Sequence, residues 1–561
     1  MSEPSEGSSG LPLAGWRARW PAIRRSWIVH ESEDLLVLNK PEGVAGPNEV
    51  GKQPHSVVER GRRYLEEAGG QVGPLGVHHH LSIGVSGLLV LGRTKAGNRH
   101  LSQAFEARTV QAQFVVGVEG WPQGRESLTL QADTRRQRGG RKRGRSRVLK
   151  AKLTRVAECG SRSLVRVTAA STNPVAILGL LRAEGFRVAG DERHGGAFRL
   201  MMHLQALTVP NPGAGPPVVY RSKQPAAFNA WLEGTIAGLQ GQPRELLEHL
   251  ESVMERRWQR LHDADASSGR AAFRWVHREA DGVPGLALDV YGDHVVMHVY
   301  EVERTGAAQE LADEIVQMGF AGVYLKRRPL RANELGGEER SVVAPSDPLA
   351  GEAAEDVEVC ENGVTYQVAL GDGLSTGLFL DQRRNRRRLM SLAEGSSILN
   401  LFAYTGAFSV AAAHAGARET VSVDASRRAL DRAERMLESF GEGHRVVKAD
   451  VFRFLESSKD FDVVIVDPPT HSTVEGNRWR SGAEWTELAS QCARRVASSG
   501  WLVACSNDSR MTGGTFTRRL EEGVHAAGRV IEEIDHELPE GDFPPHPSRG
   551  CHLKSVWMRL R

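Results

Sequence analysis

The feature that most constrains the fold is an alternation of apolar runs and helical segments from about residue 371 onward. The runs "SILNLFA", "ETVSVDAS", "HRVVKAD" and "FDVVIVDPPT" are typical of buried strands, and helical spacing follows each of them. Short strands that alternate with helices are the pattern of a doubly wound parallel sheet. We therefore expect an α/β domain over 371–561.

The expected strands end in residues suited to bind a ligand. The first leads to a turn at Gly406 that opens a helix, and the later ones end in Asp424, Asp450 and the segment Asp467-Pro468-Pro469-Thr470. Ligands bind at this edge of such sheets, and a carboxylate after the second strand accepts ribose hydroxyls. A nicotinamide dinucleotide would favour G-x-G-x-x-G to hold its pyrophosphate, but a single glycine stands here. The pattern favours a nucleoside without phosphates, such as S-adenosylmethionine.

Several motifs carry a family resemblance. "TGLFLDQRRNRR", "NLFAYTGAFSVAAAHAGA", "SVDAS", "ADVF" and "DPPT" occur in the order found in class I methyltransferases that modify 23S ribosomal RNA. From about Phe273 to its end, the chain resembles both the guanine-N7 and the cytosine-C5 enzymes. The resemblance implies a Rossmann-like methyltransferase sheet, S-adenosylmethionine as cofactor and RNA as substrate.

The resemblance also implies cofactor contacts by Phe379, Asp381, Arg383 and Tyr404, with Asp450 at the adenine amine. With the turn and strand-end residues, the expected cofactor set is Phe379, Asp381, Arg383, Asn400, Phe402, Tyr404, Gly406, Asp424, Asp450 and Asp467. Structural alternatives stay open. Asp381 could pair with Arg383 or Arg384 on a helix, Asp450 could be only a helix cap, and Phe379 and Phe402 could be core residues.

The methylated atom depends on a cysteine. Carbon-5 of cytosine accepts a methyl group only after a cysteine thiolate adds at C6. In the cytosine-C5 family that cysteine aligns with Asn507, and Cys505 lies two residues earlier. Two residues along a strand displace a side chain by about 6–7 Å. We therefore expect Cys505 to be a small buried residue.

Guanine N7 already has a lone pair and needs only orientation, so its methylation requires neither cysteine nor general base. Enzymes for exocyclic amines usually carry an aromatic residue after (D/N)PP, where Thr470 stands here. "GLFLDQR", "DPPT", "SND" and the tail "EGDFPPHPSRGCHLKSVW" resemble the N7 enzymes. We predict guanine-N7 methylation of 23S rRNA, with cytosine-C5 methylation and a non-catalytic RNA-binding or ribosome-assembly protein as alternatives. The predicted catalytic residues are Asp467, Pro468, Pro469 and Asn507.

The first part of the chain carries a second resemblance. "LLVLNKPEGV", "SGLLVLGRTKAGNRHLSQAFEARTV", "GDERHGG" and "LMMHLQALTVPNP" resemble pseudouridine synthases of the RluA type. The family's catalytic aspartate falls at Ser82, its tyrosine at Phe114 and its pairing arginine at Leu178. A neutral serine without a base cannot replace the carboxylate. We predict a mixed α+β domain that has lost synthase activity and aids RNA binding; a purely structural domain and residual synthase activity are the alternatives.

Spacing and composition complete the expected organisation. Leu246, Leu250, Val253 and Trp258 predict a linker helix, and short alternating runs after it predict a small α+β module. The expected segments are a polar tail (1–25), the synthase-like domain (26–217), the linker (218–265), the α+β module (266–370) and the methyltransferase domain (371–561).

Charge and cysteine usage bear on partners and location. The net charge is only +3, but the segment Thr134–Lys152 is strongly basic without an acidic residue, which favours contact with RNA phosphates. The five cysteines form no CxxC pair, and His78–His80 have no acidic or cysteine companions, so we expect no metal site. Since no apolar leader or membrane-spanning run occurs, a cytoplasmic protein without a membrane partner is expected. The oligomeric state does not follow from the sequence.

Overall fold

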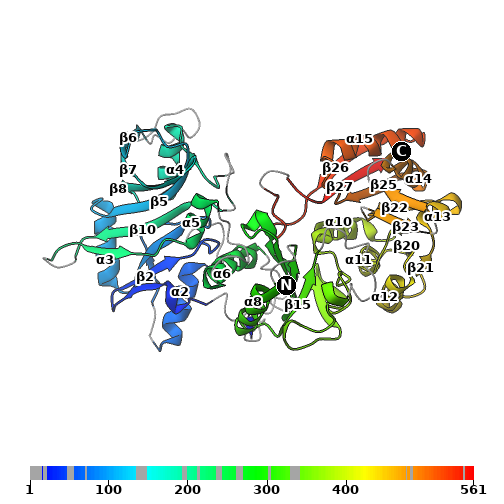
Figure 1. Cartoon of the computed structure of the whole chain (residues 1–561), viewed down its shortest axis with the longest axis horizontal. Coiled ribbons are helices and arrows are strands. Elements are labelled where there is room, and N and C mark those ends of the chain that lie inside the picture. Colours follow the sequence, from blue (N-terminus) through cyan, green and yellow to red (C-terminus); the bar gives the residue numbers. More distant parts are fainter. Residues whose placement is uncertain are drawn as a thin grey trace, which may run out of the picture. The chain divides into compact units, whose positions relative to one another are not determined.

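The computed structural model divides the chain into two compact units (Figure 1). The first comprises Met1–His262, Arg278–Leu286 and Arg304–Gly319, and the second Asp263–His277, Ala287–Glu303 and Phe320–Arg561. Among the described residues, no helix has the length and hydropathy needed to cross a bilayer. The described residues are 15–16, 22–46, 56–69, 73–133, 148–191, 197, 199–211, 215–234, 243–260, 270–300, 305–328, 341–469, 471–474, 477–480, 484–546 and 550–561.

A mixed sheet is the scaffold of the first unit. In its described part, β11 (Val218–Arg221) pairs with β10, β3 (Gly76–Val77) with β4, and β9 (Arg187–Val188) with β5. The main path runs in the order β1 (Ile28–Glu31), β2 (Leu35–Lys40), β4 (Ser86–Gly92), β10 (Met202–Val209), β5 (Gln111–Glu119), β8 (Arg162–Ala169), β7 (Val148–Cys159) and β6 (Ser127–Asp133).

Helices supply the remaining core of this unit. Residues of α3 (Lys95–Glu106) and α4 (Pro174–Ala183) join the main apolar cluster of the sheet, and α2 (Val57–Glu67) joins a second cluster. A third cluster contains Phe228 and Trp231 of α5 (Ala226–Glu233). The sheet and its core thus continue past residue 217 in the sequence.

The predicted linker helix is present as α6 (Pro243–Arg260). Leu246, Leu250 and Val253 are buried, as their spacing predicts, while the side chain of Trp258 lies outside the described part of the chain. α6 packs within the first unit, where it contacts α8 (Thr305–Gln317).

The second unit begins with a small sheet in the order β12 (Ala272–His277), β13 (Leu286–Tyr291), β14 (His294–Val299), β15 (Gly322–Arg327) and β16 (Ala350–Gly351). A hairpin, β17 (Val357–Glu361) and β18 (Val364–Val368), follows. Tyr291, Tyr324 and Tyr366 share one apolar cluster with Val410 of the C-terminal domain. A common core therefore fixes the small sheet to that domain.

The C-terminal sheet has the order β21 (His444–Lys448), β20 (Glu419–Asp424), β19 (Ser397–Leu401), β22 (Phe461–Val466), β25 (Val496–Ser506), β27 (Lys554–Leu560) and β26 (Ile531–Glu537). The expected parallel sheet is present, but it ends in a strand that the expectation did not include, because β27 runs antiparallel to β25 and β26. The first five strands are parallel. Their ends form the edge at which the predicted site residues gather.

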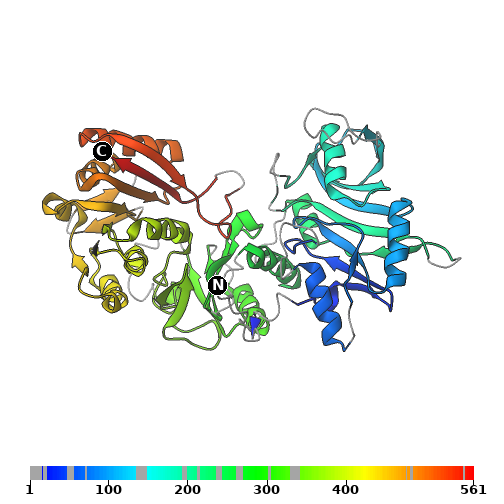
Figure 2. The same cartoon turned by 180° about the vertical axis from the view of Figure 1, so that it is seen from behind.

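Helices cover both faces of this sheet (Figures 1 and 2). One apolar cluster combines strand residues such as Leu399 and Val464 with α14 (Trp485–Ala493) and α15 (Gly513–Ala526). The other combines the alternate residues, such as Ile398 and Val463, with α10 (Arg383–Ala393) and α11 (Ala407–His414). This alternation is the period of two expected for strands buried on both faces. The remaining elements are η4 (Leu380–Gln382), α12 (Arg427–Leu437), η5 (Glu438–Phe440), α13 (Val451–Ser457) and the hairpin β23 (His471–Val474) and β24 (Asn477–Arg480).

Candidate active site

A cavity of about 650 Å³ lies at the carboxyl edge of the C-terminal sheet. It has the size of sites that enclose small organic ligands. The predicted site residues that line it are Phe379, Asp381, Asn400, Phe402, Tyr404, Asp424, Asp450, Asp467, Pro468, Pro469 and Asn507. The chain thus brings most of the predicted residues together around one space.

The turn after β19 shapes one wall of the cavity. Phe402 and Tyr404 have φ values of 55° and 51°, in the left-handed region, which is uncommon for aromatic residues. Such strain occurs at sites where the backbone serves a ligand. Gly406, with φ 75°, does not line the cavity; a Cβ there would lie 2.8 Å from Cβ of Ala433 on α12. This glycine lets two helices approach closely, and its predicted contact with the cofactor stays a prediction.

Asp424, at the end of β20, is oriented by backbone donors. Its carboxylate accepts hydrogen bonds from the N–H groups of Tyr404 at 2.9 Å and Ser426 at 2.8 Å. Ser426 in turn caps α12 by accepting from the N–H of Ala429. The turn and the next helix start therefore fix a carboxylate in the position where this fold binds a ribose.

Asp450 is a helix cap, as one interpretation predicted, and its contact with the adenine amine stays a prediction. It is the N-cap of α13, where its Oδ1 accepts from the N–H of Arg453 at 3.1 Å, and it also lines the cavity. Phe379 is not a core residue, since 52% of its surface is exposed. Its ring lies 5.5 Å from that of Tyr404, so the two form an aromatic wall on which a flat ring can stack.

Two carboxylates from different elements face the same cavity. Asp467, after β22, accepts a hydrogen bond from Nε2 of Gln382 at 2.8 Å. Burial and the charge of Asp381 raise the pKa of Asp467 to about 7. Although burial opposes ionisation of Asp381, the hydrogen bond from His552 at 2.9 Å and the charge of Arg274 lower its pKa. Asp381 therefore pairs with His552, not with Arg383 or Arg384.

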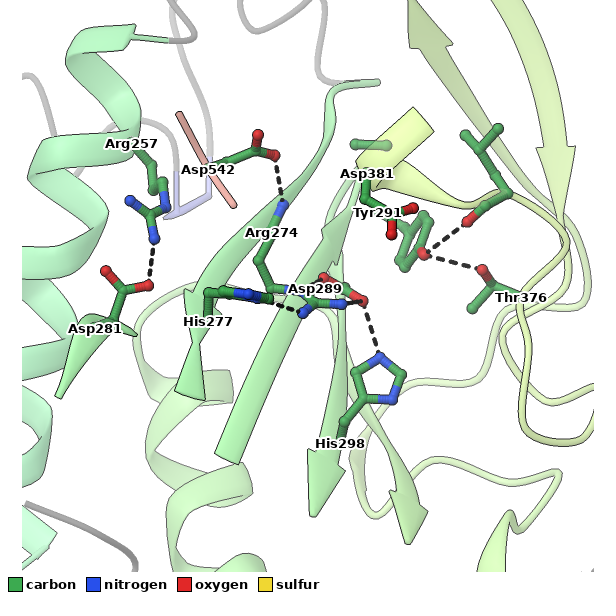
Figure 3. A network of polar contacts seen from close by, with 12 residues as sticks. Arg257, Arg274, His277, Asp281, Asp289, Tyr291, His298, Thr376, Asp381 and Asp542 are labelled. Carbon is green, nitrogen blue, oxygen red and sulfur yellow. Dashed lines mark hydrogen bonds and ion pairs between the residues drawn. The ribbon is translucent and has the colours of Figure 1, made fainter. Parts of the chain in front are cut away.

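A buried polar network supports the wall that carries Asp381 (Figure 3). Arg274 pairs with Asp289, and Asp289 accepts a further hydrogen bond from His298 at 2.9 Å. Tyr291 contacts the carbonyl oxygen of Leu378 at 3.4 Å and the hydroxyl of Thr376 at 2.9 Å. These bonds tie the small sheet to the segment that ends in Asp381.

Arg383 was predicted to contact the cofactor, but the structure places it elsewhere. It does not line the cavity. Its buried guanidinium donates to Asp542 at 3.0 Å and Glu540 at 3.2 Å, and its Nε lies 3.6 Å from Glu361. Because three carboxylates already compensate its charge, the guanidinium is held away from the cofactor cavity. It fastens the C-terminal segment to α10.

Cys505 is buried on β25 and does not line the cavity. Its sulfur contacts Gln382 at 3.7 Å and Ser555 at 3.6 Å, and burial raises the pKa of the thiol. The predicted small buried residue is confirmed. Asn507, two residues later, does line the cavity.

The sequence reasoning missed several lining or supporting residues, among them Gln382, His552 and Glu484. Gln382 lies in the "FLDQR" motif beside Asp381, so its position was an available signal. His552 lies in the tail "EGDFPPHPSRGCHLKSVW", but only the fold brings that tail to η4. Nothing in the pattern around Glu484 marks it as a cavity residue.

Two positions that the pseudouridine-synthase resemblance singles out, Phe114 and Leu178, lie in or against the apolar core of the first unit. Phe114 is fully buried in the main cluster, and Leu178 packs against the same cluster.

His79 is buried and accepts from the N–H of Val90 at 3.1 Å, and burial lowers its pKa to about 3. In the described part of the chain, no three His, Cys, Asp or Glu residues are grouped as metal ligands. Of the basic segment, 134–147 lie outside the described residues, as do 192–196 of "GDERHGG", and 148–152 belong to β7.

The cavity fits S-adenosylmethionine on three grounds. Asp424 is preoriented for ribose hydroxyls, Phe379 and Tyr404 offer aromatic faces, and Asp381 with Asp467 supplies negative charge for a cationic donor. Among the described residues that line the cavity, Arg386 is a single cation and no cluster of phosphate-binding cations is present. The geometry therefore agrees with a cationic nucleoside.

Comparisons with known proteins agree with S-adenosylmethionine as the ligand of this cavity. The model of the S-adenosylmethionine-dependent methyltransferase family matches residues 338–547. The "Ribosomal RNA large subunit methyltransferase" of Deinococcus radiodurans is 31% identical over 55% of this chain and 78% of its own length. The "Ribosomal RNA large subunit methyltransferase K/L" of Vibrio parahaemolyticus is 30% identical over 49% of this chain and 38% of its own length. The "Ribosomal RNA large subunit methyltransferase I" of Alteromonas mediterranea is 28% identical over 56% and 78%. The chain belongs to the S-adenosylmethionine-dependent methyltransferases of large-subunit ribosomal RNA.

Proposed function

We propose that the chain methylates N7 of a guanine in 23S rRNA or its large-subunit precursor. The supporting observation is the pair Cys505 and Asn507. Asn507 lines the cavity at the position where the cytosine-C5 resemblance expects the nucleophile, and Cys505 is buried outside it. A buried thiol with a raised pKa is a poor nucleophile. Guanine N7 needs no such nucleophile.

The chain's own residues then bind and orient. When bound, the cofactor supplies an electrophilic methyl group. Phe379, Tyr404, Asp424 and Asp450 hold its nucleoside, and Pro468 with Pro469 keeps the loop after β22 rigid. The amide of Asn507 can donate to the guanine O6 and the carboxylate of Asp467 can accept from a guanine N–H, so that N7 faces the methyl group.

Mass spectrometry of nucleosides from 23S rRNA, incubated with the purified chain and isotope-labelled cofactor, tests this proposal. We expect labelled 7-methylguanosine. Labelled 5-methylcytidine would overturn it in favour of the cytosine-C5 reaction. Absence of transfer to any rRNA precursor, with the protein folded, would favour a non-catalytic RNA-binding or ribosome-assembly protein.

A covalent trap tests the role of the cysteine separately. Cytosine-C5 enzymes form a stable adduct with RNA that contains 5-fluorocytidine, because the cysteine adds and cannot be eliminated. We expect no adduct, and we expect Cys505→Ala to keep methyl transfer within about threefold because the thiol does not face the cavity. An adduct that Cys505→Ala abolishes would contradict the proposal.

We further propose that the first unit is a pseudouridine-synthase-like domain without synthase activity that aids RNA binding. Ser82 in place of the catalytic aspartate and the fully buried Phe114 support the loss of activity. The basic segment Thr134–Lys152 supports RNA binding.

Replacing Arg141, Lys142, Arg143 and Arg145 by Gln in the full chain should flatten the salt dependence of rRNA binding. An unchanged slope would favour a purely structural domain, and a pseudouridine lost on gene deletion and restored only with Ser82 intact would show residual synthase activity.

A further inference from the structure

Asp381 and Asp467 face one cavity but have different partners. Asp381 receives a hydrogen bond from the imidazole of His552 at 2.9 Å. Asp467 receives one from the neutral amide of Gln382 at 2.8 Å, and no described residue forms an ion pair with it. Asp467 therefore lacks a cationic partner in the described part of the protein.

The sheet order says which part of the cofactor would lie near these two carboxylates. β20 and β21 lie on one side of β19, and β22 lies on the other. Asp424 and Asp450 stand at the ends of the first pair, and Asp467 stands at the end of β22. A nucleoside held by Asp424 and Asp450 leaves the sulfonium and ammonium groups for the half of the cavity with Asp381 and Asp467.

We propose that Asp467 is a proton switch of the cofactor site, a step that rests on the assignment of S-adenosylmethionine to this cavity. While the cavity holds no cation, Asp467 is protonated in a large share of the molecules at neutral pH, because its charge would stand beside that of Asp381. It releases the proton to solvent when the sulfonium is bound, and it takes one up from solvent after the products have left. The protons balance over one catalytic cycle.

The groups facing Asp467 agree with this assignment. They are Asp381 and Gln382 of η4, Arg386 of α10 and Cys505 of β25. Arg386 is committed to Glu361, which it contacts at 2.6 and 2.7 Å, so it compensates Asp467 only weakly. The pKa of Asp467, raised to about 7 by burial and by Asp381, places the exchange near neutral pH.

The switch distinguishes donor from product. S-adenosylhomocysteine has a neutral thioether where the donor has a sulfonium. It therefore lowers the pKa of Asp467 less than the donor does. Binding of the product should therefore release fewer protons than binding of the donor. In the proposed guanine-N7 reaction the positive charge passes to the base, so Asp467 stays ionised until the methylated base departs.

Isothermal titration calorimetry of the full chain tests the switch. Titrations at pH 7 in PIPES and in imidazole, which differ in ionisation enthalpy, give the number of protons released for each ligand. We expect about half a proton per S-adenosylmethionine at pH 7, and close to none at pH 9 where Asp467 is already ionised. S-adenosylhomocysteine should release clearly fewer at pH 7.

Variants separate the possible outcomes. Asp467→Asn should abolish the difference between donor and product. Asp450→Asn, a carboxylate change at the opposite end of the cavity, should weaken binding and keep that difference. Equal proton release by donor and product in the unmodified chain would overturn the switch and leave the methyltransferase assignment intact. No binding of either ligand to folded protein would instead overturn the cofactor assignment of this cavity.

Discussion

Nε2 of His552 lies 2.9 Å from Oδ2 of Asp381, so a residue near the C-terminus holds a carboxylate of the cofactor cavity. Hydrogen bonds to charged groups contribute about 1.5–3 kcal/mol, and the lower end applies because 35% of the His552 side chain is exposed. We expect His552→Gln to weaken S-adenosylhomocysteine binding about 3–10-fold by calorimetry, with kcat little changed. His525→Gln on the exposed side of α15 is the control. Unchanged affinity would mean that Asp381 is held without His552.

Asp424 should decide the affinity for the ribose part of the cofactor. Two backbone N–H groups orient its carboxylate, and the remaining lone pairs can accept two ribose hydroxyls. We expect Asp424→Ala to lower adenosine affinity by about 30–100-fold and adenine affinity far less. Glu419→Gln, at the start of the same strand, controls for a general effect on β20. Equal losses for adenine and adenosine would show that Asp424 acts on the fold alone.

The strand-end pattern could be predicted because each signal is local. A short strand pattern followed by Asp424, Asp450 or Asp467 is visible in the sequence, and the sheet brings these ends to one edge. The antiparallel β27 was missed because a short apolar run does not reveal the direction in which it pairs. Direction is set by contacts with β25 that are distant in sequence.

Individual side-chain roles in the site were harder to predict for the same reason. Arg383 stands in a cofactor motif, yet its partners Asp542 and Glu540 come from the C-terminal tail. His552 reaches Asp381 across a large sequence separation. A motif fixes the backbone of its own element, whereas the partner of a long side chain depends on the whole fold.

Replacing Gly406 should affect the stability of the fold more than it affects cofactor binding. Its φ is 75°, and a side-chain methyl group at this position would lie 2.8 Å from Cβ of Ala433, so both the backbone and the packing oppose a side chain. We expect Gly406→Ala to destabilise the fold by about 1–3 kcal/mol in chemical unfolding. Gly514→Ala in α15, where a Cβ meets open space, should be neutral or stabilise by up to about 1 kcal/mol. Equal effects of the two variants would contradict this account.

Arg383 should behave as a structural residue. Replacing Arg383 by lysine would remove the planar guanidinium whose Nη1 donates to both Asp542 and Glu540. Because the group is buried, the lost hydrogen bonds would lower the free energy of unfolding. We expect Arg383→Lys to lower the unfolding free energy by about 2–4 kcal/mol. The folded fraction should bind S-adenosylhomocysteine with its affinity changed less than about threefold, because the guanidinium does not line the cavity. A large loss of affinity in a stable variant would restore Arg383 to the cofactor set.

Asp467 should make the cofactor-free protein less stable as pH rises. Its folded pKa of about 7 lies above its ordinary value of 3.8, so the folded state binds the proton more tightly than the unfolded state. The resulting penalty is absent below about pH 4, grows through the interval and is complete above about pH 7. Asp467→Asn, which removes the charge, should therefore raise Tm by about 2–4 °C at pH 8 and leave it nearly unchanged at pH 4.

Asp462→Asn is the matched control with the opposite sign. Although burial opposes ionisation of Asp462, hydrogen bonds from Ser397 lower its pKa, so its carboxylate stabilises the fold above its unfolded pKa and loses this effect as pH falls. We expect Asp462→Asn to lower Tm at pH 8 and to have little effect at pH 3. If the Asp467→Asn shift in Tm were the same at pH 4 and pH 8, the carboxyl would not be titrating near neutrality. The proton switch would then lose its source, because a group already ionised in the empty cavity has no proton to release when a cation binds.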